Sequence, residues 1–530
     1  MGRVSELTQL HAWFEKACCG ERQLIFVTGE AGIGKTMLVE TFLEQLAASG
    51  TAWLGHGQCV EHYGAGEAYL PLLEAFGRLG REPGGEQLVA ILSRYAPTWL
   101  VQMPALLEAG DLPTLQQNIV GATQGRMLRE MAEALEALTA ERPLVLCVED
   151  LHWSDSSSVE LLAYLARRLG PVRLMFVGTY RPVDVILREH PLKGVKQDLL
   201  LHGYGEELRL EFLSEGVVEQ YLGERFVGSV FADRLAPVIH RRTEGNPLFM
   251  VNVMNDLVRQ EVIVPRAEGW TASEVEDIQL PSGIQGFIEQ QIEQADPDIQ
   301  LLLEAASIAG MDFSATTIAS VFEEAVETVE RHCETLVRRE QFLHRSGEQQ
   351  VANGTVSARY RFIHALYQEP FYNRVTPGQR ARLHRRMGES LEQLFPAQTG
   401  QLAVELAMHF ERGQDYPKAM QYLWQAGETA TRRYAPQEAV RHYTKSLELL
   451  ALTPDTPERA QQELMLLITV GAPLIAAKSW IAPEVEQTYA RARELCQQIG
   501  EAPQLFPALA GLYRFSVIRG EYATAQELAL

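Results

Sequence analysis

The fold of this chain is decided by the stretch Gly29-Glu30-Ala31-Gly32-Ile33-Gly34-Lys35-Thr36. The short apolar run 24–27 precedes it, and apolar residues recur at helical spacing between positions 37 and 46. This order predicts a strand, a glycine-rich loop and a helix, which is the context that the pattern Gly-x-x-x-x-Gly-Lys-Ser/Thr requires. In that context the backbone N–H groups of the loop and of the helix N-terminus face a chain of phosphates. We therefore expect ATP or ADP to bind at this loop.

The two polar side chains that end the loop have separate expected roles. Lys35 is expected to reach the β and γ phosphates, and the Thr36 hydroxyl is expected to ligate Mg²⁺. The glycines Gly29, Gly32 and Gly34 allow the backbone to approach the phosphates closely. A chance match is the alternative, and the predicted strand and helix on either side argue against it.

A second apolar run, 143–148, ends in the acid pair Glu149-Asp150. The pair is expected at the carboxyl end of a strand beside the phosphate loop, where ligands of parallel sheets bind. One carboxylate would hold Mg²⁺ through water while the other orients or polarises the attacking water. The sequence leaves open which acid has which role. An apolar run that ends in two acids is common, so this interpretation depends on the loop upstream.

A third apolar run, 172–178, is followed by Thr179-Tyr180-Arg181. Arg181 is therefore a candidate sensor of the γ phosphate, able to stabilise charge that develops during phosphoryl transfer. An ordinary surface arginine is the alternative.

Four motifs together resemble one known family, the signal-transduction ATPases with numerous domains (STAND ATPases), which are AAA+-like P-loop proteins of large bacterial regulators. Besides the loop, the motifs are the N-terminal positions Gly2, Arg3, Glu6 and Leu7, the run Val148-Glu149-Asp150-Leu151-His152-Trp153-Ser154-Asp155, and Gly245-Asn246-Pro247-Leu248-Phe249. The resemblance covers about residues 2 to 395.

The resemblance implies roles for single residues. Pro247 would lie against the adenine from a helical lid, Arg181 would sense the γ phosphate, and Glu149 and Asp150 would serve Mg²⁺. The segment 360–366 resembles the winged-helix motif whose histidine contacts bound nucleotide, which makes His364 a candidate nucleotide contact. A histidine packed in a small core is the alternative. His152 and Trp153 are interpreted as packing residues, because such side chains just past a strand usually pack beneath a loop.

The expected fold class is an α/β P-loop NTPase, a parallel sheet with flanking helices, followed by an all-helical lid, a winged-helix domain and tetratricopeptide-like helical repeats. We expect the ATPase core at 1–200 with a helical insertion at about 60–140, the lid at 201–278, the winged helix at 279–398 and the repeats at 399–530. A predicted hairpin at 341–344 and 360–363 supports the winged helix.

Internal similarity supports the repeats. The stretch 412–419 recurs at 519–525, and 443–449 resembles 489–495. The first spacing is close to three units of about 34 residues, the length of a tetratricopeptide helix pair. The apolar helix face is still open at 526–530, so we expect this chain to be part of a longer regulator.

The composition disfavours several classes of function. The chain has 530 residues and a formal net charge of −22, which disfavours direct contact with nucleic acid. The acidic surroundings of the winged helix disfavour DNA recognition as well. We find no secretory signal and no apolar stretch near the roughly 18 residues of a membrane helix, and we expect a cytoplasmic protein that contacts no membrane. The six cysteines lack metal spacing and are expected to be reduced.

We expect a regulatory switch in signal transduction or transcription, with ATP or ADP and Mg²⁺ as cofactors, slow hydrolysis, a protein or small-molecule inducer on the repeats, and nucleotide-dependent self-association. Two alternatives stay open. The chain could be a tetratricopeptide scaffold with a vestigial ATPase, or an ATP-driven remodelling ATPase with fast turnover.

Overall fold

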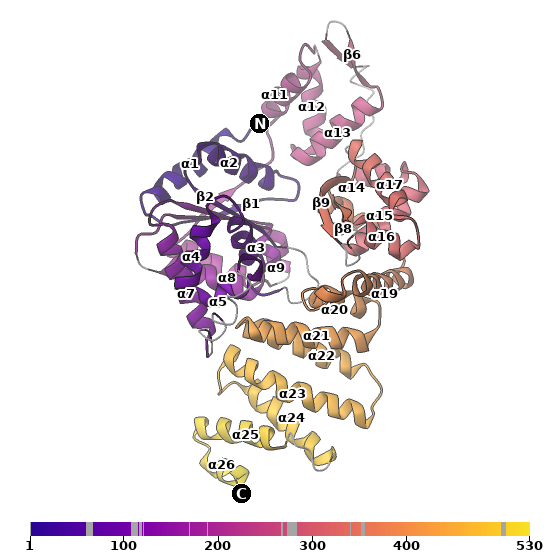
Figure 1. Ribbon diagram of the computed structural model, residues 1–530. Helices are drawn as coiled ribbons and strands as arrows, with labels where there is room; N and C mark the ends of the chain where they lie inside the picture. The colour runs from indigo at the N-terminus through magenta and orange to yellow at the C-terminus, as the bar shows by residue number, and fades with distance from the viewer. Residues whose placement is uncertain are drawn as a thin grey trace.

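The computed structural model describes residues 2–59, 67–107, 115, 119, 121–168, 170–187, 189–229, 231–266, 269–272, 284–339, 341–350, 354, 356–499 and 505–529. The segments in which an ATPase core, a lid, a winged helix and helical repeats are expected follow one another along the chain, and these names are kept for them below (Figure 1). The repeats form an elongated stack that lies beneath both the ATPase core and the winged-helix region in this view (Figure 1).

A five-stranded parallel sheet forms the centre of the ATPase core. Its strands are β1 (Gln23–Thr28), β2 (Trp53–Gln58), β3 (Leu144–Glu149), β4 (Leu174–Tyr180) and β5 (Glu206–Arg209), in the spatial order β2-β3-β4-β1-β5. Strand β4 lies between the loop strand β1 and the acid-bearing strand β3 and pairs with both. The sequence predicted no strand order, because pairing of distant strands leaves no local trace in the sequence.

Both faces of this sheet are covered. On one face, Ile25 and Val27 of β1 pack with α1 (Val4–Cys18) and α2 (Lys35–Ser49). Leu24 and Phe26 face the opposite layer, because successive side chains of a strand alternate in direction. That second layer contains α3 (Leu70–Leu79), α4 (Gly85–Tyr95), α5 (Pro97–Leu100), η1 (Pro104–Leu106), α7 (Gln124–Leu138), η2 (Leu151–Trp153), α8 (Ser156–Arg167), α9 (Pro182–Leu187) and α10 (Leu192–Leu201).

Two predicted boundaries of the ATPase core differ from those in the structure. The sheet continues to β5, which pairs with β1, so the predicted end of the core at residue 200 is too early. The predicted helical insertion at about 60–140 corresponds to α3–α7, but the strand β2 precedes it and belongs to the sheet. The sequence did not indicate β2, because two of its six residues are Gly55 and Gly57, which disfavour strands. Close packing requires glycine at position 57, because a Cβ on Gly57 would lie 1.9 Å from the Pro71 carbonyl oxygen.

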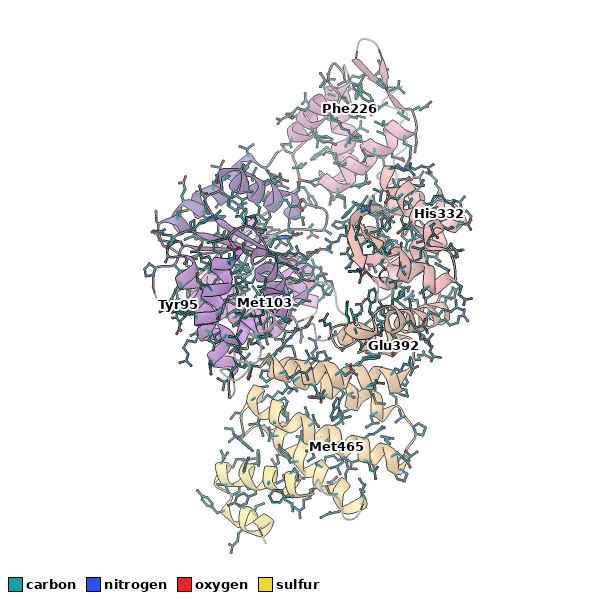
Figure 2. All side chains as sticks on the ribbon, viewed as in Figure 1. Tyr95, Met103, Phe226, His332, Glu392 and Met465 are labelled. Atoms are coloured by element: carbon teal, nitrogen blue, oxygen red, sulfur yellow. The ribbon has the colours of Figure 1, made fainter. Side chains whose placement is uncertain are left out.

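The lid consists of α11 (Glu215–Arg225), α12 (Ala232–Thr243) and α13 (Pro247–Arg259), followed by an antiparallel hairpin of β6 (Ile263–Arg266) and β7 (Gly269–Ala272). The hairpin was not predicted, since the lid was expected to be helical throughout. Phe226 lies in the lid's own apolar cluster, against Phe231 and Trp270 (Figure 2).

The predicted hairpin is present in the winged-helix region. Strands β9 (Leu343–Gln350) and β10 (Val356–Phe362) pair antiparallel, and β8 (Asp312–Ser314) joins the other edge of β10. The helices of this region are α14 (Ile284–Glu293), α15 (Pro297–Ala309), α16 (Ala315–Phe322), α17 (Val326–Arg338), α18 (Ala365–Arg374) and α19 (Pro377–Leu394). Glu392 of α19 accepts hydrogen bonds from Lys418 and Tyr422, and so connects this region to the repeats (Figure 2).

The C-terminal part is a stack of helices. It contains η4 (Pro396–Gln398), α20 (Ala403–Arg412), α21 (Tyr416–Arg432), α22 (Pro436–Ala451), α23 (Pro457–Lys478), α24 (Pro483–Ile499), α25 (Leu505–Arg519) and α26 (Tyr522–Ala529). The recurring stretches 412–419 and 519–525 both lie at a turn between consecutive helices.

The second internal similarity has a packing cause. Tyr443 of α22 lies against Gly427 of the preceding helix, where an added Cβ would be 2.6 Å from the ring. Tyr489 of α24 lies against Gly471 of its preceding helix, where an added Cβ would be 2.3 Å from the hydroxyl oxygen. The two tyrosines therefore occupy equivalent positions in successive helix pairs.

Helix α23 corrects one expectation. Among the described residues, α23 is one helix that is long and apolar enough to cross a membrane by length and composition, whereas the sequence analysis predicts no such stretch. It packs between α22 and α24, and its buried side chains include Leu464, Leu467 and Val470. Packing within the helical stack accounts for part of this apolar composition, since 39% of the apolar window is buried.

Candidate nucleotide site

The loop 29–34 joins β1 to α2 as predicted. Gly32 and Gly34 have φ values of 74° and 93°, in the left-handed region that favours glycine. Gly32 also allows a close approach, because a Cβ there would lie 2.8 Å from the Leu248 Cβ of the lid. Glycine is therefore needed both for the turn and for contact with the lid.

Lys35 lies within the curve of the loop. Its Nζ donates hydrogen bonds to the carbonyl oxygens of Gly29, at 2.8 Å, and Glu30, at 2.9 Å. Burial, together with the nearby Arg181 charge, lowers the pKa of Lys35 to about 8, although Asp150 and Glu30 oppose this shift. The ammonium group is thus largely charged at neutral pH, in a position where phosphate oxygens could replace the two carbonyls as acceptors.

Glu149 is joined directly to the expected magnesium ligand. The Thr36 hydroxyl donates a hydrogen bond of 2.6 Å to Glu149 Oε2, and His56 Nε2 lies 2.8 Å from Glu149 Oε1. Burial acts to raise the pKa of Glu149, but the hydrogen bonds from His56 and Thr36 outweigh burial and hold the pKa below its ordinary value. Glu149 is therefore ionised beside Thr36, and these two oxygen donors fit a hard cation such as Mg²⁺.

Asp150 has a different environment from its neighbour. Its backbone is left-handed, with φ 56°, and its N–H donates to Thr179 Oγ1 at 3.0 Å. Burial raises the pKa of Asp150 and the Glu149 charge adds to this, while Arg181, Lys35 and a hydrogen bond from Gln58 act in the opposite direction. The geometry thus separates the two acids, with Glu149 at the Thr36 hydroxyl and Asp150 towards the cations.

Arg181 follows the last residue of β4, where the sequence predicted it. Its Nη1 lies 3.9 Å from Asp184 Oδ2. His152 is buried, with Nε2 3.5 Å from Asp184 Oδ2 and Nδ1 3.9 Å from Asp150 Oδ1. The buried imidazole between two carboxylates agrees with the interpretation of His152 as a packing residue.

The lid lies directly on the phosphate loop. Asn246 donates from Nδ2 to the Ala31 carbonyl at 3.0 Å, and the Leu248 N–H donates to the Gly32 carbonyl at 3.2 Å. The Asn246 side chain also caps α13, whose first residue is Pro247. Pro247 is therefore held next to the loop, which is compatible with its expected role at the adenine.

The N-terminal motif reaches the same loop. Arg3 Nη2 donates to the Ile33 carbonyl at 3.2 Å and to the Glu211 carbonyl at 2.6 Å, just beyond β5. Neither Arg3 nor Asn246 was predicted as a site residue, although both belong to motifs that carry the family resemblance. His56 and Gln58 were missed together with β2.

The winged-helix region contributes His364 to this neighbourhood. His364 caps α18, and its Nδ1 accepts from the Leu366 N–H at 3.1 Å. Burial, with contributions from the positive charges of Arg181 and Lys35, lowers the pKa of His364 to about 3. The imidazole is therefore neutral at physiological pH and lies within electrostatic range of the two cations of the phosphate site.

Within the described ranges, no group of three or more His, Cys, Asp or Glu side chains could hold a metal ion. The donors at Thr36, Glu149 and Asp150 suit Mg²⁺, which commonly keeps several waters and takes further ligands from substrate phosphates.

Residues 1–177 match the family model of the AAA ATPase domain. The match covers the loop, both acids and most of β4, and it assigns the N-terminal part of this chain to the AAA ATPases. An AAA ATPase domain implies nucleotide binding.

Longer similarities are more distant. The chain is 24% identical over 534 residues to an uncharacterized protein of Rhizobium meliloti, covering 96% of this chain and 49% of that protein, so the chain spans about half the length of this relative. Among solved structures, it resembles a STAND protein with a tetratricopeptide repeat sensor from Pyrococcus horikoshii, at 12% identity and a TM-score of 0.41 over 98% of this chain and 81% of that one. It also resembles a Walker-type ATPase of Pyrococcus abyssi, at 12% identity and a TM-score of 0.29 over 70% and 95% of the two chains.

Proposed function

We propose that this chain is a nucleotide-dependent regulatory switch of the STAND type, with slow ATP hydrolysis. The observation that carries the proposal is the convergence of the other parts of the chain on one phosphate loop. The lid donates to the loop through Asn246, and the winged-helix region brings His364 within range of Lys35. A nucleotide bound there would therefore alter the surroundings of two other parts of the chain at once.

The side chains of the site suit phosphoryl transfer to water. Lys35 and Arg181 would neutralise charge on the β and γ phosphates, and Asp150 would orient the attacking water. Mg²⁺, held by Thr36 and through water by Glu149, would supply further neutralisation of the phosphate charge. Pro247 would lie against the adenine.

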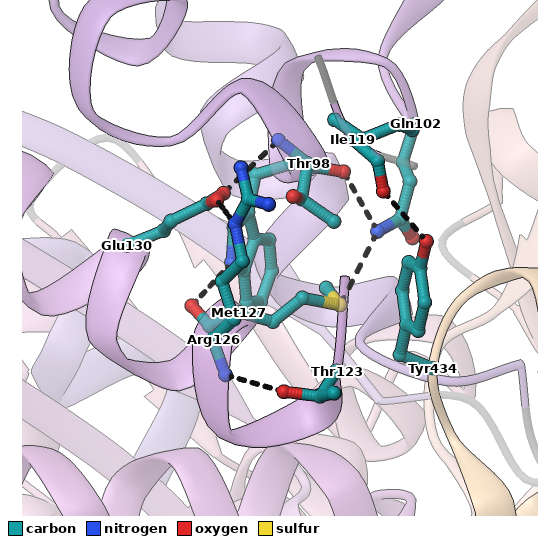
Figure 3. Close-up of polar contacts among 9 residues, drawn as sticks. Thr98, Gln102, Ile119, Thr123, Arg126, Met127, Glu130 and Tyr434 are labelled. Carbon is teal, nitrogen blue, oxygen red and sulfur yellow. Dashed lines mark hydrogen bonds and ion pairs between the residues drawn. The ribbon is translucent and has the colours of Figure 1, made fainter. Parts of the chain in front are cut away.

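The repeats provide a second input. Glu438 of α22 is buried, and its carboxylate accepts hydrogen bonds from the N–H and hydroxyl of Ser157, at 3.0 and 2.7 Å, at the start of α8. Tyr434 donates to the Ile119 carbonyl at 3.3 Å, beside the contacts that Gln102 makes within the α5–α7 layer (Figure 3). An inducer bound to the repeats would act on the ATPase core through these contacts.

The bound ligands must also supply enough free energy to shift the chain between its two states. Moving a two-state equilibrium from 1:99 to 99:1 requires ligands to prefer one state by about 5.5 kcal/mol. Contacts of the γ phosphate with Arg181 and Lys35, together with a ligand on the repeats, could supply this difference. Self-association and an effector output are part of the proposal, because ATP and an inducer would expose surfaces that the closed chain buries.

Binding of a fluorescent ATP analogue tests the proposal first. Lys35→Ala is expected to weaken nucleotide binding by at least about tenfold, since the lysine supplies a buried charge to the phosphates. Lys193→Ala in α10 is the matched control and is expected to bind as the wild type does. Steady-state turnover then separates a switch, which releases phosphate slowly, from a remodelling ATPase. Equal affinity in the wild type and Lys35→Ala would count against the proposal.

A further inference from the structure

The winged-helix region contacts the ATPase sheet at the edge that carries the two acids. Arg361 of β10 donates from Nη1 to Gln58 Oε1 at 2.9 Å. Gln58 is the last residue of β2 and is the register partner of Glu149 in β3. A single hydrogen bond thus joins residues 303 positions apart, at the carboxyl ends of the strands where catalysis is expected.

Arg361 is held in place from its own side. Its Nε donates to Asp312 Oδ2 at 2.6 Å, and Asp312 is its register partner on the neighbouring strand β8. The ion pair fixes the plane of the guanidinium before it meets Gln58. Because the planar guanidinium presents several donors in a rigid arrangement, one edge can serve Asp312 while another serves Gln58.

Gln58 continues the chain of hydrogen bonds to a catalytic acid. Its amide oxygen accepts from Arg361, so its amide nitrogen is the atom left to donate. Gln58 is paired in register with Glu149, the residue before Asp150, and a donor from Gln58 is among the causes that lower the pKa of Asp150. A guanidinium on the oxygen polarises the amide and makes its N–H a stronger donor, because hydrogen bonds in a chain reinforce one another.

Asp150 interacts with groups on two sides. Lys35 and Arg181 attract its carboxylate from the phosphate side, whereas Gln58 holds it from the β2 side. Glu149 also has a partner on β2, His56. Of these two acids, Asp150 is the one whose partner on β2 is in turn bound by the winged helix.

We propose that Gln58 and Arg361 are positioning residues for ATP hydrolysis, in which Arg361 holds Gln58 and Gln58 keeps Asp150 aligned with the attacking water. This inference rests on the proposed function. In the step concerned, the water oxygen bonds to the γ phosphorus while the bond to the β–γ bridging oxygen breaks, and the electron pair of that bond leaves with ADP. Both protons of the water end on the released phosphate, from which one can then dissociate to solvent. Hydrolysis is then fastest when the winged helix is docked, so the same domain that senses nucleotide also sets the rate.

Single-turnover hydrolysis with enzyme in excess, combined with steady-state kinetics, tests the inference in the full-length chain. Gln58→Ala and Arg361→Ala are each expected to lower kcat roughly tenfold while KM stays within about twofold, because each acts on the alignment of a catalytic group and not on phosphate binding. The double variant is expected to match either single variant, since both substitutions break one chain of contacts. Arg361→Lys is expected to restore part of the rate. The matched control is Arg345→Ala, whose half-exposed side chain pairs with Glu348 on β9.

The outcomes are distinct. An Arg361→Ala rate equal to that of Arg345→Ala, or a double variant whose loss is the product of the two single losses, would overturn the inference. Thermal melting identifies a variant that fails to fold, and Gln58→Ala, which leaves the Arg361–Asp312 pair intact, then decides on its own. If the wild type hydrolyses ATP no faster than Lys35→Ala, the proposed function fails and the inference fails with it. If only the Gln58 and Arg361 variants behave as wild type, the inference alone fails.

Discussion

The helical repeats and the winged-helix region both contact the ATPase core, but by different kinds of contact. The repeats contribute Ala435, Ala439 and Tyr443 to the same apolar cluster as the second layer of the ATPase core. The winged-helix region belongs to another cluster, shared with α20 and α21, and reaches the ATPase sheet through the polar contact of Arg361 with Gln58. One contact is a continuous core, and the other is a hydrogen bond at the catalytic edge.

This difference suggests a division of roles. Burial of apolar surface is favourable whatever nucleotide is bound, and so the repeat contact is expected to hold the chain closed in both nucleotide states. A polar contact beside the phosphates depends on the local charges, and so the winged-helix contact is expected to respond to the γ phosphate. The repeats would then be released by a ligand of their own, not by ATP alone.

The largest effect is expected from Glu438→Lys. This change removes both acceptors of Ser157 and buries a cation at the positive end of α8, a disruption that typically costs about 3–5 kcal/mol. The repeats should separate from the ATPase core, and limited proteolysis and small-angle scattering should detect a longer molecule.

Glu448→Lys on the same helix is the matched control, since that side chain is 61% exposed. If Glu448→Lys also separates the repeats from the ATPase core, then the net charge of α22, and not the contact of Glu438 with Ser157, holds the interface.

A smaller effect is expected from Glu438→Gln, which keeps the shape of the contact. Burial, with the nearby Glu438 charge, raises the pKa of Asp155 to about 7. Since the folded chain then holds a proton that the unfolded chain releases, stability should be fullest below the unfolded pKa and should fall as pH rises from there through the raised pKa of Asp155. Glutamine removes the repulsion, and urea unfolding between pH 5 and pH 8 should show a flatter dependence. An unchanged slope would exclude this coupling.

The smallest effect is expected from Asp312→Asn, on the winged-helix side. The substitution removes a partly exposed ion pair behind Arg361 and should cost about 0.5–1 kcal/mol. Hydrogen exchange should quicken in β8 and β10 and stay unchanged in α22. Faster exchange in α22 would show that the two contacts are not independent.

The comparison also shows what sequence can and cannot predict here. The loop, Glu149-Asp150 and Arg181 were predicted because each is a short motif at the end of an apolar run. Strand β5 was missed because Leu208 is its one buried residue, and β2 was missed because its glycines obscure a strand. The partners His56 and Gln58 were missed with it, since their role depends on pairing of β2 with β3, which lies far along the chain.

The different surroundings of the two acids needed the structure for a related reason. Glu149 and Asp150 are neighbours with the same chemistry, but Glu149 is bound by Thr36 and His56 and Asp150 has a left-handed backbone. The repeats were predictable in outline, because the pairing of Tyr443 with Gly427 recurs at Tyr489 and Gly471.

In the proposed switch, nucleotide state changes the position of the winged helix relative to the ATPase core. The most direct measurement is the distance between spin labels on Glu44 of α2 and Val356 of β10, in ADP and in a non-hydrolysable ATP analogue with Mg²⁺. We predict different distance distributions in the two nucleotides for the wild type and one common distribution for Lys35→Ala. Identical distributions in the wild type, with both nucleotides bound, would contradict the account.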